Sequence, residues 1–426
     1  MNLFKISKLA KTNATQAAQE ILLFVKENFP EIKATNISIN DSKVSLNSVN
    51  GFVTTPETEY FFKFHTEENE EQSLENTEYY QGELLRKAGL PVLSPVYKLT
   101  KPGQQFLIYE KIEAKTAFDL FETEEYLFFD KGNYDEKKIK QLLEAEVNLL
   151  RKVKNVFLKT LKIVDSKTIQ DSSIYQLFYH RLVGKNNTKP RLNLFYLDHE
   201  ITLNNQKIPF KDFANFNWII NGVAYQETFN EVITQAQDLL NPLKTKETAV
   251  VLGHGDDHNG NKFFINNEFL FFDPAFAGWH PALLSFIKAT AHNTWLHPFW
   301  LYEPQRVNEV LDFNYQIKNN TIEVNHNWDS FQKSPVREEI LNLQIKEVWR
   351  PLLTELKKQN VLPDFWKNYI RKALFCCPFL VYNLIDTSKY NATQSLLALT
   401  KALELGAQAE KSTSVDLFLE KIDSSL

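Results

Sequence analysis

The hydrophobic pattern of this chain changes its period near residue 113, and this change limits the folds that the chain can adopt. Up to residue 65 the apolar residues form short β-type runs separated by turn residues. The runs are Asn36 to Ile39, Val44 to Val49, Phe52 to Thr55 and Tyr60 to His65. Asn50-Gly51 and Pro56-Glu57 interrupt them, and Asn-Gly between two such runs is a strong hairpin signal. The first part of the chain is therefore predicted to be an antiparallel sheet.

A helix is expected after the third strand of this sheet. Leu74, Leu84, Leu85 and Ala88 can share one helical face, and Gly89 with Pro91 ends it. The glutamate-rich stretch at 67–78 is interpreted as a solvated loop and helix start. Two further strands are predicted at Val92 to Leu99 and Phe106 to Ile112, joined by a turn at Lys101-Pro102-Gly103. The acidic stretch Glu113 to Glu125 is interpreted as a linker.

Beyond Lys137 the apolar spacing becomes helical. One helical face carries Ile139, Leu142, Leu143, Val147, Leu150 and Val153. Further helices are predicted at Asn230 to Leu240, Glu338 to Leu356, Phe365 to Phe375, Gln394 to Leu405 and Val415 to Ile422. One strand-rich island, Ala249 to Phe272, interrupts them. The prediction is an α+β fold with an N-terminal domain of residues 1–112 and a mostly α C-terminal domain of residues 113–426.

Composition excludes several classes of partner. The formal net charge of −5 over 426 residues gives no reason to expect nucleic acid or an anionic membrane as a partner. The apolar stretch Ala373 to Tyr382 is too short for a membrane span, which needs roughly 20 residues. The N-terminus does not read as a secretory signal, and the adjacent cysteines Cys376 and Cys377 suit neither a disulfide framework nor a spaced metal site. A cytoplasmic location is expected.

The strand-rich island contains a polar loop dense in chemically active groups. Apolar residues precede His254-Gly255-Asp256-Asp257-His258-Asn259-Gly260-Asn261, and a second strand leads to Asp273. Phosphoryl transfer needs a carboxylate that orients the acceptor hydroxyl and oxygen ligands for the magnesium that bridges the phosphates. Asp256 can serve as the carboxylate, and Asn261 with Asp273 can serve as the ligands. Gly255 and Gly260 allow the loop to turn so that Asp256 and Asn261 converge.

The pattern His254-Gly255-Asp256-x-His258-x-x-Asn261, followed by a strand and Asp273, resembles the aminoglycoside phosphotransferase and choline kinase group of small-molecule kinases. The resemblance implies a protein-kinase-like fold of two lobes. It also implies that Asp256 is the catalytic base, that His254 and His258 support the loop, and that Asn261 and Asp273 hold Mg²⁺.

The first 112 residues match the ATP-binding lobe of this group. Lys63, on the third strand, corresponds to the lysine that binds the α- and β-phosphates, and Glu83, on the next helix, to its pairing glutamate, with Glu75 and Glu78 as competitors. The stretch Tyr109 to Lys111 corresponds to the backbone that meets adenine, which makes Glu110 and Lys111 candidate cofactor-binding residues. The resemblance thus implies ATP and Mg²⁺ as cofactors and a small-molecule acceptor as partner.

The chain departs from this pattern in three respects. The stretch between Ile112 and His254 is long, so family-specific helices are expected around the acceptor pocket. The other two departures are local. The first hairpin holds one glycine, Gly51, and no Gly-x-Gly-x-x-Gly loop, and Asp273 is followed by Pro274-Ala275-Phe276-Ala277 rather than Phe-Gly. The missing glycine-rich loop leaves open how the phosphates are covered. The sequence after Asp273 is closer to the sugar-kinase branches than to protein kinases.

Three other functions remain open from the sequence. A metal-dependent hydrolase could use His254, Asp256, His258 and Asp273 as ligands, because imidazole and carboxylate suit Zn²⁺ or Mn²⁺. A catalytically silent kinase-like protein could bind nucleotide or another protein without turnover. A kinase-like enzyme could instead modify proteins or transfer a nucleotide. Several aromatic and basic residues are left undecided between core and acceptor site: His180, Arg181, Trp279, His280, Trp295, His297 and Trp300.

Overall fold

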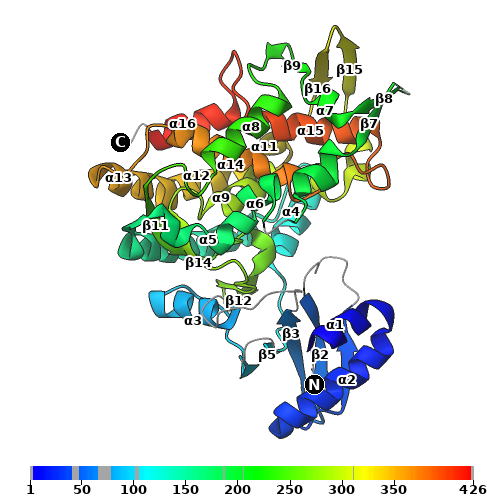
Figure 1. Ribbon diagram of the computed structural model, residues 1–426, viewed down its shortest axis with the longest axis vertical. Helices are drawn as coiled ribbons and strands as arrows, with labels where there is room; N and C mark the ends of the chain where they lie inside the picture. Colours follow the sequence, from blue (N-terminus) through cyan, green and yellow to red (C-terminus); the bar gives the residue numbers. More distant parts are fainter. Residues whose placement is uncertain are drawn as a thin grey trace. The chain divides into compact units, whose positions relative to one another are not determined.

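The computed structural model describes residues 3–40, 48–65, 78–100, 105–185, 188–204, 206–309 and 311–423 (Figure 1). The chain divides into two compact units. The N-terminal unit consists of Met1–Lys87, Pro91–Ala114 and Phe272–Ala275, and the C-terminal unit of Ala88–Leu90, Lys115–Phe271 and Phe276–Leu426. The main boundary between the units follows Ala114, whereas the sequence predicted a boundary after Ile112. The functions expected for the two domains stay predictions.

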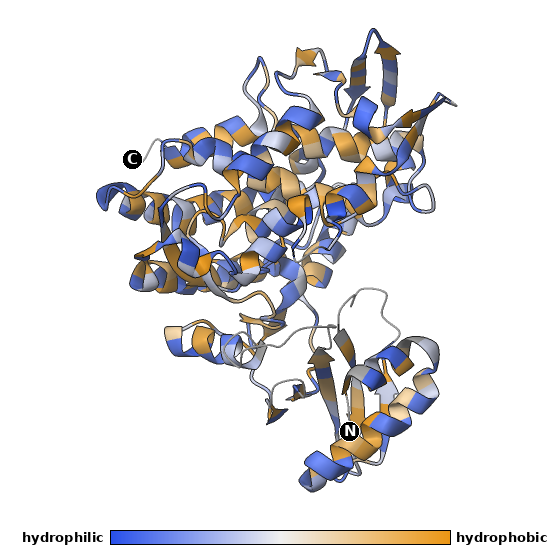
Figure 2. Ribbon diagram, viewed as in Figure 1, coloured by the Kyte–Doolittle hydropathy of each residue, from blue (hydrophilic) through white to orange (hydrophobic). Residues whose placement is uncertain are grey.

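The N-terminal unit is built on a five-stranded antiparallel sheet with the strand order β1-β2-β3-β5-β4. The strands are β1 (Asn36–Ile39), β2 (Ser48–Thr54), β3 (Glu59–His65), β4 (Tyr97–Leu99) and β5 (Phe106–Glu110). Figure 2 shows hydrophobic residues along its central strands. Their alternate side chains Phe62, Phe64 and Phe106 are buried and stack on one another, as β-type alternation predicts.

Two helices that the sequence pattern did not reveal complete this core. Helices α1 (Leu3–Thr12) and α2 (Ala14–Asn28) place buried residues such as Leu3, Ile21 and Phe24 in the same apolar cluster as Phe106 of β5. The rings of Phe24 and Phe106 lie 5.2 Å apart. The expected helix after β3 is confirmed as α3 (Glu78–Ala88). Residues 66–77, with Leu74, and the turn at 101–103 lie outside the described residues.

The predicted hairpin turn at Asn50-Gly51 is wrong. Gly51 lies inside β2, where it pairs with Ile39 of β1 on one side and Phe62 of β3 on the other. A Cβ at Gly51 would lie 2.0 Å from the carbonyl oxygen of Ser38, so the glycine is needed for close strand approach rather than for a turn. The β2–β3 turn is at Thr55–Thr58 and contains the predicted Pro56-Glu57; there Thr55 N–H donates to Thr58 O at 2.9 Å.

Helices make up most of the C-terminal unit, and those predicted from helical spacing are confirmed. The longest is α5 (Glu136–Thr160), and α14 (Trp366–Phe379) packs against α8 (Phe229–Leu239) and α15 (Ala392–Gly406). The remaining helices of eight residues or more are α4 (Ala117–Lys131), α12 (Pro335–Gln344), α13 (Arg350–Lys358) and α16 (Ser414–Asp423). Cys376 and Cys377 of α14 are free thiols, both buried. Among the described residues, no helix combines the length and apolar character of a membrane span.

Short helices connect these long ones. They are η1 (Pro30–Ile32) in the N-terminal unit and, in the C-terminal unit, η3 (Ser166–Ile169), η4 (Ser173–Gln176), α6 (Tyr179–Val183), η5 (Asn193–Leu197), α7 (Phe210–Phe213), η6 (Asn259–Asn261), α9 (Ile287–Thr290), η7 (Ala291–Trp295), α10 (Pro298–Leu301), η8 (Pro304–Glu309), α11 (Ser330–Lys333) and η9 (Ile345–Trp349). The segment η9 joins α12 to α13, so the predicted helix at Glu338 to Leu356 is continuous with a local change of winding.

Strands are more widespread in the C-terminal unit than the sequence indicated. The predicted island contains β11 (Glu247–Gly253), β12 (Lys262–Ile265) and β13 (Glu268–Phe271). The sheets of this unit have the strand orders β14-β11-β6, β12-β13, β10-β9-β16-β15 and β7-β8. The strands outside the island are β6 (Lys162–Asp165), β7 (Glu200–Leu203), β8 (Gln206–Pro209), β9 (Asn217–Ile220), β10 (Val223–Ala224), β14 (Gly278–Pro281), β15 (Phe313–Lys318) and β16 (Thr321–His326).

The predicted linker at Glu113 to Glu125 is wrong over most of its length. Thr116 and Asp119 form a capping box that begins α4 at Ala117, and Gly132 in a left-handed conformation ends it. Helix α4 packs against β12 and the turn η6. Acidic residues that suggested a solvated linker are thus partly buried, with Glu124 and Glu125 less than 5% exposed.

Gly51→Ala is expected to destabilise the N-terminal sheet by about 3 kcal/mol, because backbone atoms surround the new Cβ and cannot move aside. The measurement is amide hydrogen exchange in peptides that cover β1 to β3, which reports this unit alone. Gly82→Ala in α3 is the control, because its Cβ would meet side-chain atoms rather than backbone, those of Pro274 at 3.3 Å and Arg86 at 3.5 Å. Equal exchange in both variants would contradict the expectation.

Candidate functional site

The polar loop between β11 and β12 is held in a tight turn. Gly255 has a φ of +84°, and a Cβ there would lie 2.7 Å from Phe276 O and 2.9 Å from the His280 ring. Only glycine fits this conformation and this space. His280 is fixed in turn, because its ring nitrogens contact Phe276 O at 2.9 Å and Ser285 Oγ at 3.1 Å. The undecided His280 is therefore a structural support for the loop.

The loop brings Asp256 and Asn261 together, as their spacing around Gly255 and Gly260 predicted. The side-chain amide of Asn261 donates to the backbone carbonyl of Asp256 at 2.8 Å. The Gly260 N–H donates to His258 Nδ1 at 3.0 Å, and the Asn261 N–H to His258 O at 2.9 Å. The side-chain nitrogen of Asn261 donates to the backbone, so the side-chain oxygen of Asn261 remains as an acceptor.

Asp256 carries a mostly buried negative charge, with its side chain 19% exposed, beside the buried cation of Lys288. Lys288 Nζ of α9 lies 3.4 Å from Asp256 Oδ1, and His258 Nε2 lies 3.7 Å from the same oxygen. Burial raises the pKa of Asp256, but the charges of Lys288 and the neighbouring histidines outweigh it and lower the pKa to about 2. Among the described residues Asp256 Oδ1 accepts no hydrogen bond. The carboxylate is thus ionised at neutral pH, with acceptor capacity left on Oδ1.

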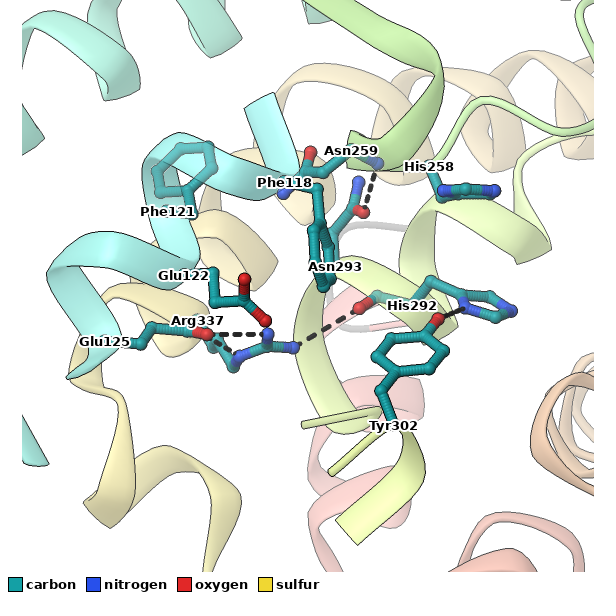
Figure 3. A pocket seen from close by; sticks show the side chains of 10 residues that line it. All are labelled: Phe118, Phe121, Glu122, Glu125, His258, Asn259, His292, Asn293, Tyr302 and Arg337. Atoms are coloured by element: carbon teal, nitrogen blue, oxygen red, sulfur yellow. Dashed lines mark hydrogen bonds and ion pairs between the residues drawn. The ribbon is translucent and has the colours of Figure 1, made fainter. Parts of the chain in front are cut away.

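Lys288 starts a short polar chain that sequence reasoning missed. The Lys288 Nζ lies 3.0 Å from His292 Nε2. Figure 3 shows the next contact of this chain, in which the Tyr302 hydroxyl lies 3.4 Å from His292 Nδ1. The rings of His258 and His292 stack with centroids 5.3 Å apart. Burial lowers the pKa of His258 to about 4 and that of His292 well below its ordinary value, so both are neutral at pH 7. The available signal was a lone lysine within the apolar stretch Leu283–Ala291.

A pocket lies beside His258 and Asn259 (Figure 3). Helix α4 contributes Phe118, Phe121, Glu122 and Glu125, and the opposite wall consists of His292, Asn293, Tyr302 and Arg337. Glu125 and Arg337 form a buried bidentate ion pair, and Arg337 also donates to Leu296 O at 3.1 Å. Burial, together with the charge of Glu303, raises the pKa of Glu122 to about 7.

The remaining polar residues of the loop anchor it to its surroundings. His254 is buried and its ring lies 4.9 Å from that of Phe271, and its role in supporting the loop stays a prediction. Lys262, just after the loop, forms a buried ion pair with Glu146 of α5 at 2.8 Å. The Asn259 N–H donates to Asn293 Oδ1 at 2.8 Å. These contacts fix the turn on both sides.

The N-terminal unit contains the other candidate site residues. Lys63 of β3 is buried, and its ammonium forms an ion pair with Asp273, which belongs to the same unit. Asp273 has a φ of +56°, an uncommon backbone conformation for a residue other than glycine, and its side chain is 41% exposed. The predicted lysine of the third strand therefore contacts the predicted metal-binding carboxylate.

Glu83, Glu110 and Lys111 have contacts of a different kind. Glu83 forms an ion pair with Arg86 of its own helix, which lowers the pKa of Glu83. Glu110 ends β5 and is exposed, whereas Lys111 pairs with Glu59 at 2.9 Å. The competitor Glu75 lies outside the described residues, and Glu78 begins α3. Cofactor binding by Glu83, Glu110 and Lys111 stays a prediction.

Each unit offers one oxygen donor of the kind that Mg²⁺ prefers. Asn261 offers an amide oxygen in the C-terminal unit, and Asp273 offers a partly exposed carboxylate in the N-terminal unit. Metal binding by these two residues stays a prediction. Within the described part of the chain, no three His, Cys, Asp or Glu side chains gather as a metal site. Neither adjacent cysteine belongs to such a group.

Comparisons with known proteins found similarity in solved structures alone. No family model and no curated protein matches this chain. A spectinomycin phosphotransferase in complex with ADP and spectinomycin has 13% identity and a TM-score of 0.43, covering 96% of this chain and 99% of that chain. An amicoumacin kinase in complex with AMP-PNP, Ca²⁺ and Ami has 15% identity and a TM-score of 0.45, covering 91% of this chain and 92% of that chain. A choline kinase from Cryptosporidium parvum has 12% identity and a TM-score of 0.37, covering 95% of this chain and 95% of that chain.

Asp257 should make the stability of the C-terminal unit depend on pH. Burial raises its pKa to about 7, so between about pH 4 and 7 the folded unit keeps a proton that the unfolded chain loses. The free energy of unfolding therefore falls as pH rises through this window. Asp257→Asn should remove this fall and stabilise the unit at pH 7 by on the order of a few kcal/mol.

Urea unfolding followed by tryptophan fluorescence between pH 4.5 and 7.5 checks this expectation, because every tryptophan lies in the C-terminal unit. The exposed Asp212→Asn is the matched control and should behave as the wild type. A pH dependence that persists in Asp257→Asn would contradict the expectation.

Proposed function

We propose that this protein is an ATP-dependent phosphotransferase that moves the γ-phosphoryl group of ATP to a hydroxyl of a small molecule, such as a sugar, an aminoglycoside, an amino alcohol or a related metabolite. The observation that carries the proposal is the hydrogen bond from the Asn261 amide to the Asp256 carbonyl. It supports the proposal because Asp256, a carboxylate, and Asn261, which has a side-chain oxygen, lie on one turn, and phosphoryl transfer needs a carboxylate and oxygen ligands.

Asp256 is the catalytic base in this proposal. Its carboxylate accepts a hydrogen bond from the acceptor hydroxyl and takes the proton as the oxygen–phosphorus bond forms and the bond from the γ-phosphorus to the bridging oxygen breaks. Its pKa of about 2 makes it a weak base, which fits a reaction whose transition state needs orientation of the nucleophile more than early proton removal. Lys288 keeps this carboxylate ionised.

Lys63, Asn261 and Asp273 are the proposed ligands of the Mg–ATP complex. Magnesium neutralises charge on the phosphates when bound. Lys63 would hold the α- and β-phosphates, and Asn261 and Asp273 would offer oxygens to the metal. The ion pair of Lys63 with Asp273 compensates both charges in the structure. Glu83, Glu110 and Lys111 keep the supporting roles around ATP that the resemblance implies.

The geometry favours this function over a hydrolase. A zinc site would need ring nitrogens of His254 and His258 turned to one metal ion. His258 Nδ1 instead accepts from the Gly260 N–H, and the His254 ring packs against Phe271. A hydrolase also gives no purpose to the buried Lys63 that contacts Asp273.

Nucleotide binding tests the cofactor part of the proposal. ATP with Mg²⁺ should raise the thermal midpoint of the wild-type protein, because a ligand that binds only the native state stabilises it by mass action, by about 2.7 kcal/mol at a hundredfold excess over the dissociation constant. EDTA should abolish the metal-dependent part. Lys63→Ala and Asp273→Ala should lose the shift, and the exposed Lys26→Ala should keep it. A shift with Zn²⁺ or Mn²⁺ alone, and none with ATP or GTP, would favour the hydrolase.

Asp256→Ala tests the catalytic part. ADP formation with a small-molecule acceptor should fall by at least about 100-fold, the usual contribution of a general base, while the nucleotide-dependent thermal shift remains. Asp212→Ala, an exposed substitution, should keep full activity. Wild-type turnover in Asp256→Ala would refute the assigned role, whereas nucleotide binding without turnover in the wild type across an acceptor panel would indicate a catalytically silent protein.

A further inference from the structure

A second cavity of about 300 Å³ lies within the C-terminal unit. Its aromatic lining side chains are Tyr225, Trp295, Trp300, Trp328 and Phe331. Polar groups from β16, α15 and the loop after α15 complete the wall. A concave site of this size, with aromatic walls and a few polar groups, has the composition of a small-molecule site.

This cavity is separate from the catalytic loop. It shares no lining residue with the pocket beside His258. The segment Ala291–Tyr302 divides the two, since it gives His292 and Tyr302 to the pocket and Trp295 and Trp300 to the cavity. In Figure 1 the elements β9, β16 and α15, which contribute to the cavity, lie at the opposite end of this unit from β12, which follows the loop. The proposed phosphoryl transfer makes no use of the cavity.

His326 in the cavity wall has an unsatisfied hydrogen-bond donor. Its Nδ1 accepts from the Trp328 N–H at 3.1 Å, and burial lowers its pKa to about 3, so the neutral ring carries its proton on Nε2. Within the described residues that donor has no hydrogen-bond partner, and Glu404 Oε1 is 3.9 Å away, beyond hydrogen-bond range. The indole N–H of Trp300 is likewise buried and unpaired. A hydroxyl can accept from His326 and donate to Glu404.

The charges of the wall are largely compensated. Lys401 forms an ion pair with Glu404 at 2.8 Å and donates to Trp328 O at 3.1 Å. The Asp329 carboxylate caps α11 by accepting from the N–H groups of Phe331 and Gln332. Lys411 is exposed. A neutral ligand therefore fits this wall better than an ion, because a buried ion needs an uncompensated partner of opposite charge.

We propose that this cavity binds an uncharged ring compound that carries several hydroxyl groups, the chemistry of a monosaccharide. The ring packs against the aromatic walls, and its hydroxyls complete the hydrogen bonds of His326 and Glu404. The ring and the hydroxyls are both needed, because the walls offer apolar area together with buried polar groups that are costly to leave unpaired.

Isothermal titration of the full-length protein without nucleotide tests the site. The probes are methyl glycosides of glucose, galactose and mannose and myo-inositol, compared with sorbitol, which has hydroxyls but no ring, and indole, which has a ring but no hydroxyls. At least one ring polyol should bind with a dissociation constant of about 1 mM, and sorbitol and indole at least tenfold more weakly. Because nucleotide is left out, failure here leaves the proposed phosphotransferase function untouched.

Two variants test whether the ring polyol binds in this cavity. Val223→Phe fills the cavity, and His326→Phe removes the hydrogen-bond donor. Each substitution should lower the affinity for the ring polyol by at least about tenfold. Trp366→Phe in α14, a buried tryptophan outside the cavity, is the matched control and should bind as the wild type. Undiminished binding in Val223→Phe, binding of indole alone, or no binding of any ring polyol would each overturn the proposal.

Discussion

The mostly buried carboxylate of Asp256 is the constraint on which the candidate site depends. A charge without compensation inside a protein is very costly, so the surrounding structure must supply cations and dipoles. Lys288 at 3.4 Å supplies the cation, and it arrives from α9, more than thirty residues further along the chain. The packing of α9 against α14 therefore serves the site as well as the core. The same need explains why Lys262, next to the loop, is matched by Glu146 of α5.

The loop itself could be predicted from the sequence because its information is local. Gly255, Asp256, Gly260 and Asn261 lie within seven positions, and turn chemistry alone brings the Asn261 side chain against the backbone of Asp256. Lys288 could not be assigned in the same way, because nothing local indicates which cation will face a given carboxylate. Its position within an apolar stretch signals a buried charge but not its partner.

Other predictions from the sequence were wrong because tertiary contacts override the local pattern. Asn50-Gly51 is a strong hairpin pattern, yet the neighbouring strands approach so closely at Gly51 that glycine is required in the middle of β2. The acidic stretch before Glu125 lacks a clear apolar stripe, but its capping box starts α4, and Arg337 compensates Glu125 inside the fold. The α+β class and the major helices were predictable because their periodicity extends over many residues.

The adjacent cysteines of α14 have a consequence for how this protein responds to thiol reagents. Both are fully buried, burial raises the pKa of Cys377 to about 12, and Cys376 is shifted in the same direction. A thiol reacts as its thiolate, so these side chains are inert while α14 remains packed against α8 and α15. Their alkylation rate therefore reports how often the centre of the C-terminal unit opens, so the cysteine pair can serve as an intrinsic probe of unfolding.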